Sequence, residues 1–99
     1  MNASIAIQVL PTAKSTEEVV RIVDEVIAYI ASTGLPYYVG PFETTIEGDD
    51  YDQLIDIVKE CQKVAIKAGC TSVSAYVKIA YKPEGGVLTI DEKVSKYHK

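Results

Sequence analysis

The segment YYVGPFETTIEG, residues 37–48, decides the fold because it contains two strand signals separated by a turn. Its first three residues favour extended backbone, and Gly40-Pro41 interrupts them. The extended pattern resumes over residues 42–47, with β-branched side chains in the middle. The segment therefore predicts a β-hairpin.

The chain before this hairpin has the pattern of a strand followed by a helix. Apolar side chains alternate with small or polar ones over residues 4–10, a period of two that is typical of a strand. Ser15 stands three residues before Glu18, which predicts a capping box at the start of a helix. Apolar residues then recur at helical spacing over residues 19–30, and we expect Gly34 to end the helix in a left-handed conformation.

The chain after the hairpin repeats this order. The pair Asp49-Asp50 is suited to cap a second helix, because carboxylates accept hydrogen bonds from the free amides of a first turn. The apolar stripe of that helix consists of Leu54, Ile57, Val58, Cys61, Val64, Ala65 and Ala68. We expect Gly69 to end it, and alternating apolar residues predict a last strand over residues 73–79. Thr89 and Glu92 predict a second capping box that opens a short C-terminal helix.

The order β-α-β-β-α-β over residues 1–99 predicts a single α+β domain with the ferredoxin-like sandwich fold. In this fold a four-stranded antiparallel sheet carries two helices on one face. Right-handed crossovers place the first and third strands in the centre of the sheet. The length suits one compact domain with its own core.

The alternation also separates the two faces of the sheet. The side chains expected under the helices are Ile5, Ile7, Val9, Val39, Ile46, Val73, Ala75, Val77 and Ile79. The opposite, open face is expected to carry Ala6, Gln8, Tyr38, Thr45, Glu47, Ser74, Tyr76 and Lys78. A face that mixes tyrosine, threonine and small residues with few charges is suited to another subunit or to a ligand. An ordinary solvated sheet face is the alternative.

Composition argues against several classes of function. The chain has 99 residues and a formal charge of −4, and its single arginine, Arg21, makes it a poor candidate for binding nucleic acid. One histidine, His98, and two cysteines leave little material for a metal site or a catalytic triad. We therefore predict a protein that is not an enzyme and needs no cofactor.

The N-terminus lacks the pattern of a secretory signal, and no apolar run could span a membrane. We therefore expect a cytoplasmic protein in which Cys61 and Cys70 are reduced and buried.

Glu47 is the residue that strand propensity explains least. On a central strand its carboxylate would lie in the middle of the open face, beside Gln8 and near Lys78. A salt bridge with Lys78 would satisfy it, since buried carboxylates need partners. The other reading is a carboxylate that receives a cationic or amidine-like ligand, with the ring of Tyr38 or Tyr76 available for stacking.

Three stretches, YYVGPFETTIEGD, KAGCTSVSAYVKIAY and TIDEKVSKY, resemble the small thiamine-binding proteins of the YkoF-like, ferredoxin-like superfamily. The resemblance covers nearly the whole chain. It implies non-enzymatic binding of thiamine or its hydroxymethylpyrimidine part by a homotetramer, a dimer of dimers with packed sheets. It also implies roles for Tyr38, Thr44, Thr45 and Glu47, which match the motif, whereas strand parity adds Gln8, Tyr76 and Lys78 to the expected ligand-binding residues. The chain departs from many relatives at residues 80–83, AYKP, where those have a basic or aspartate-rich segment.

The sequence is also compatible with two other functions. The open face could serve only to build an oligomer, which would make the protein a structural or regulatory module without a small-molecule ligand. An acylphosphatase shares the topology, but residues 10–14 lack the arginine that its phosphate cradle needs. The expected partners are therefore a small molecule and further copies of the chain, with no nucleic acid and no membrane.

Overall fold

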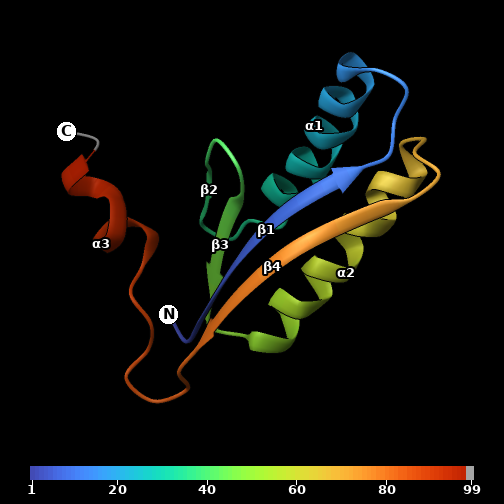
Figure 1. The fold of residues 1–99 in the computed structure, drawn as a ribbon. Coiled ribbons are helices and arrows are strands. Elements are labelled where there is room, and N and C mark those ends of the chain that lie inside the picture. Colours follow the sequence, from blue (N-terminus) through green and yellow to red (C-terminus); the bar gives the residue numbers. More distant parts are fainter. Residues whose placement is uncertain (98–99) are drawn as a thin grey trace.

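The computed structural model describes residues 1–97 and confirms the predicted fold (Figure 1). In chain order the elements are β1 (Ala3–Pro11), α1 (Thr16–Ser32), β2 (Tyr37–Val39), β3 (Thr44–Gly48), α2 (Tyr51–Lys67), β4 (Val73–Tyr81), α3 (Ile90–Val94) and the 3-10 turn η1 (Ser95–Tyr97). The four strands form one sheet in the order β2-β3-β1-β4. Every neighbouring pair is antiparallel, and β3 and β1 occupy the centre. Helices α1 and α2 lie together on one face of the sheet.

The core lies between these two helices and the sheet. Its largest fully buried side chains are Ile5, Ile22, Ile30, Ile46, Leu54 and Cys61. The register explains the grouping, because Ile5 is directly opposite Ile46 on β3 and Ile79 on β4, and paired residues share a face. Ile79 lies on the predicted face but is half exposed, since it is on an edge strand where the helices give less cover. Cys61 and Cys70 are both buried and free, as predicted.

The first helix has only half of the predicted capping box. The Ser15 hydroxyl accepts a hydrogen bond from the Glu18 amide at 3.2 Å. The Glu18 carboxylate does not return to Ser15 but accepts from Arg21 at 2.9 Å, and this hydrogen bond lowers the pKa of Glu18. Arg21 also donates to the carbonyl of Ala68 at 2.7 Å, so it joins α1 to the C-terminal end of α2. Glu18 thus pairs with Arg21 instead of completing the capping box.

The remaining caps follow the predictions. Asp50 caps α2 by accepting from the Gln53 amide. Gly34 and Gly69 follow α1 and α2 with φ of 78° and 125°, a region that favours glycine. The complete capping box of Thr89 and Glu92 is present at the start of α3.

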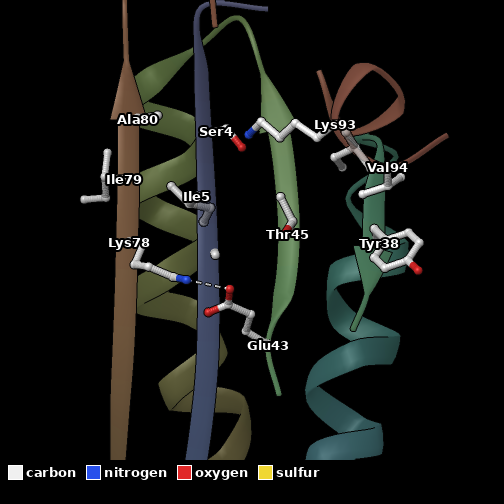
Figure 2. Close-up of a pocket in the computed structure, with 12 residues that line it drawn as sticks. Ser4, Ile5, Tyr38, Glu43, Thr45, Lys78, Ile79, Ala80, Lys93 and Val94 are labelled. Carbon is white, nitrogen blue, oxygen red and sulfur yellow. Dashed lines mark ion pairs between the residues drawn. The ribbon is translucent and has the colours of Figure 1, made fainter. Parts of the chain in front are cut away.

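The chain after β4 crosses back to the open face of the sheet. Its backbone is tied to the N-terminus, because the Lys82 amide donates to the Asn2 carbonyl at 2.9 Å and the Val87 amide to the Met1 carbonyl at 2.7 Å. Helix α3 then lies on the side of the sheet away from α1 and α2, near β2 and β3 (Figures 1 and 2). No helix within residues 1–97 is long and apolar enough to cross a membrane. His98, weighed above as a metal ligand, lies outside the described residues.

Candidate functional site

Strand register arranges the open face in rows across the sheet. One row joins Glu47, Ser4 and Ala80. The next joins Tyr38, Thr45, Ala6 and Lys78. A further row pairs Gln8 with Tyr76. The predicted assignment of Gln8, Tyr38, Thr45, Glu47, Tyr76 and Lys78 to one face is therefore correct.

A cavity of about 300 Å³ lies over the first two rows (Figure 2). Its floor comes from β1, β3 and β4, and one wall comes from α3. The lining residues are Ser4, Ile5, Ala6, Tyr38, Glu43, Thr45, Lys78, Ile79, Ala80, Ile90, Lys93 and Val94. The volume is at the lower end of the range for small-molecule sites, and the lining combines apolar surface with a few convergent polar groups.

The ion pair in this cavity is formed by Lys78 and Glu43, with 2.7 Å between Nζ and Oε1. Glu43 ends the hairpin loop, where its carbonyl accepts from the Gly40 amide at 2.9 Å, and this turn holds the residue beside the sheet. A salt bridge between Lys78 and Glu47, one of the two alternatives given for Glu47 above, is therefore not formed. Lys78 lies in the row of Thr45, one row away from Glu47. The Glu43 side chain approaches Lys78 from the side opposite to the row of Glu47 (Figure 2).

Glu47 has a different partner. The residue is 5% exposed and lies beside Ser4 rather than Gln8. Its Oε2 accepts a hydrogen bond from the Ile90 amide at 2.7 Å. Ile90 is the first residue of α3, so a carboxylate on a central strand holds the beginning of the C-terminal helix. This contact satisfies the buried oxygen.

The other predicted site residues divide into three places. Tyr38, Thr45 and Lys78 line the cavity. Gln8 and Tyr76 lie one row further along the same face, outside it, and Tyr76 is 70% exposed. Thr44 pairs with Ile7 and lies on the helix-facing side, where it lines a separate cavity of about 110 Å³ between α1 and the hairpin.

Sequence reasoning missed several residues of the cavity. Ser4 and Glu43 have the parity of the open face, Ser4 with Ala6 and Glu43 with Thr45, so strand alternation could have found them. Ile90, Lys93 and Val94 carried no such signal. Their place depends on where α3 docks, and nothing in the local pattern of residues 89–97 indicates that.

The polar groups of the cavity differ from those of a metal site or a reactive thiol site. Within residues 1–97 no three or more His, Cys, Asp or Glu side chains gather closely enough to hold a metal ion. Burial, with a smaller effect of Glu60, raises the pKa of the Cys61 thiol to about 11, so this cysteine is a poor nucleophile. The Cys70 thiol is buried and donates to the Ala65 carbonyl. The cavity instead offers a carboxylate, ammonium groups, hydroxyls and a tyrosine ring.

Comparison with known proteins agrees with this picture. Residues 5–98 match the family model described as thiamine-binding protein. A UPF0045 protein of Clostridium perfringens is 47% identical over 94 residues, which cover 95% of each chain. A UPF0045 protein of Mycobacterium bovis is 31% identical over 83 residues, covering 84% of this chain and 79% of the relative.

Solved structures are similar over nearly the full length. The structure of a Bacillus cereus domain of unknown function, DUF77, superposes with a TM-score of 0.85 at 42% identity, covering 98% of this chain and 90% of that one. A candidate thiamine biosynthesis/salvage protein from Thermotoga maritima superposes with a TM-score of 0.83 at 35% identity, covering 98% and 99%.

Proposed function

This chain belongs to the thiamine-binding protein family, and from that premise we propose that it binds thiamine or the hydroxymethylpyrimidine part of thiamine without catalysing a reaction. The binding site is the cavity between the open face and α3. The protein acts as a homo-oligomer in the cytoplasm and buffers or delivers its ligand. The ligand class is supported by the family and by the assignment of the Thermotoga maritima relative to thiamine biosynthesis or salvage.

The observation that carries the proposal is the chemistry at one end of the cavity. Thiamine has a permanently cationic thiazolium and an aminopyrimidine whose edge carries hydrogen-bond donors and acceptors. Glu43 supplies a carboxylate to the cavity, and its side chain remains 33% exposed although it pairs with Lys78. The Tyr38 ring and the Thr45 hydroxyl come from the two neighbouring strands. A cation beside a carboxylate and an aromatic face is a favourable arrangement.

A second copy of the chain would complete the site. Helix α3 covers the open face on the side of β2 and β3, while Tyr76 and Lys78 on β4 stay 70% and 72% exposed. Exposed tyrosine on a sheet with few charges suits a subunit interface. Packing two such faces together would exclude water and strengthen the polar contacts of a ligand. A dimer of dimers is the assembly we propose.

Isothermal titration of the purified protein with thiamine and with hydroxymethylpyrimidine tests the function. We expect micromolar or tighter binding of thiamine. Glu43→Gln should weaken thiamine binding by about tenfold, because it leaves the positive charge of Lys78 uncompensated beside a cationic ring. The same variant should weaken binding of the uncharged hydroxymethylpyrimidine much less.

Glu84→Gln is the matched control, since Glu84 is an exposed carboxylate in the loop after β4 and outside the cavity. Absence of detectable heat with both ligands at millimolar concentration would contradict the proposed function. It would favour the alternative, a structural or regulatory module in which the open face only builds the oligomer.

A further inference from the structure

We infer that the cavity prefers a phosphate monoester of its ligand to the free alcohol, and that Lys93 is the residue that selects the phosphate. This inference rests on the proposed function and specifies its substrate class. Candidate ligands are thiamine monophosphate and hydroxymethylpyrimidine monophosphate, which share a phosphate ester next to a heteroaromatic ring.

Lys93 extends from α3 across the cavity. Its ammonium group points toward the side chain of Ser4 on β1, at the end of the cavity away from the Glu43–Lys78 pair (Figure 2). The Ser4 residue is 5% exposed and lies on a central strand, so its hydroxyl has a well-defined position. An ammonium group and a hydroxyl directed into one cavity are suitable donors for phosphate oxygens.

The acidic groups near Lys93 are engaged with other partners, although they keep their negative charge. Lys78 is paired with Glu43. Glu92, next to Lys93 in sequence, uses its carboxylate in the capping box with Thr89, and Glu47 accepts from the Ile90 amide. The Lys93 ammonium itself makes no ion pair or hydrogen bond with any residue in the described range 1–97. Among the side chains that line the cavity, Lys78 and Glu43 pair with each other, and Lys93 is the charged group that has no ion-pair partner within the described residues.

A ligand with a negative group of its own would give the Lys93 ammonium a partner that the described part of the chain does not supply. A phosphate monoester carries a charge of about −1.5 to −2 at neutral pH. The two polar ends of the cavity lie in neighbouring rows, two residues apart on β1, which corresponds to about 7 Å along the strand. A ligand with a cationic or amidine-like ring near Glu43 and a phosphate near Lys93 would match both ends.

The test is titration calorimetry with two matched pairs, thiamine against thiamine monophosphate and hydroxymethylpyrimidine against its monophosphate, with inorganic phosphate as a further probe. We expect the wild-type protein to bind each ester about tenfold more tightly than the alcohol. Lys93→Ala should reduce this ratio to near one, and Lys93→Arg should retain most of it. Lys96→Ala is the control, because Lys96 lies on η1 over the ring of Tyr97, outside the cavity, and should keep the wild-type ratio.

Circular dichroism and thermal unfolding of each variant confirm that it folds. The inference would be overturned if the wild-type protein bound ester and alcohol with equal affinity, or if Lys93→Ala kept the wild-type ratio of the two affinities. In either case, binding of thiamine itself would leave the proposed function standing. Binding of inorganic phosphate as tight as that of the esters would also overturn it, because the ring would then contribute nothing. If none of the ring ligands binds, both proposals fail.

Discussion

The buried carboxylate of Glu47 on β3 accepts a hydrogen bond of 2.7 Å from the backbone amide of Ile90, the first residue of α3. The contact joins a central strand to a helix that has no buried residue of its own. Since α3 forms one wall of the cavity through Ile90, Lys93 and Val94, Glu47 contacts that wall without lining the cavity.

Removing the Glu47 carboxylate should release α3. We expect Glu47→Ala to cost about 1–2 kcal/mol of unfolding free energy, since it deletes a hydrogen bond to a charged group. The Ile90 amide should exchange with solvent faster in a hydrogen-exchange experiment. Glu47→Gln should retain much of the protection because its amide oxygen still accepts.

Glu84→Ala is the control for this pair, because Glu84 is exposed and should change stability by no more than about 0.5 kcal/mol. Unchanged exchange of Ile90 in Glu47→Ala would show that other contacts hold the helix.

The loop between β4 and α3 allows a second, independent test of how this segment is held. Gly85 and Gly86 both have positive φ, 88° and 74°, so either alanine variant should lose about 1–2 kcal/mol from backbone strain. At Gly86 an added Cβ would also lie 2.7 Å from the Met1 carbonyl oxygen, whereas at Gly85 it would meet only the flexible end of Lys82 at 3.5 Å.

We therefore expect Gly86→Ala to be the more destabilising variant in urea unfolding and to expose the Val87 amide, which donates to Met1, to faster exchange. Equal losses for the two variants would mean that the N-terminus moves aside easily.

Substitutions of Tyr38 and of Tyr76 should have different effects, the first on ligand binding and the second on assembly of the oligomer. Tyr38 lines the cavity, so Tyr38→Ala should weaken thiamine binding by roughly threefold to tenfold through the lost ring contact. Tyr76 is 70% exposed and outside the cavity, so Tyr76→Ala should lower the molar mass measured by light scattering after size exclusion. A reversed pattern, with mass dependent on Tyr38 alone, would contradict the placement of the interface on the β4 side.

Alkaline pH should destabilise the protein through Cys61. Burial raises the pKa of this thiol from 9.0 to about 11, so the unfolded chain loses the proton at lower pH than the folded chain. The stabilisation by the neutral thiol is complete below pH 9 and is lost as the pH rises toward 11. The urea midpoint should fall across this window, and Cys61→Ala should show a smaller fall despite its lower stability at neutral pH. An equal fall in both proteins would assign the effect to other groups.

Local patterns in the sequence determined the elements and the two faces of the sheet. The caps at Ser15, Asp50 and Thr89 depend on groups three residues away, and strand parity depends only on alternation, so both can be recognised within short windows. The same parity placed Tyr38, Thr45 and Lys78 on one face, where they line one cavity.

Only the tertiary structure decided which charges meet. The partner of Glu47 is 43 residues away, on a segment whose local pattern predicts a helix but not its docking site. Lys78 pairs with Glu43 because of how the hairpin loop returns to the sheet. Lys93 reaches the cavity because α3 lies on the open side of the sheet, next to β2 and β3. Short-range periodicity comes from backbone geometry that repeats every two or 3.6 residues. Contacts between distant side chains depend on the packing of the whole chain, which no such period encodes.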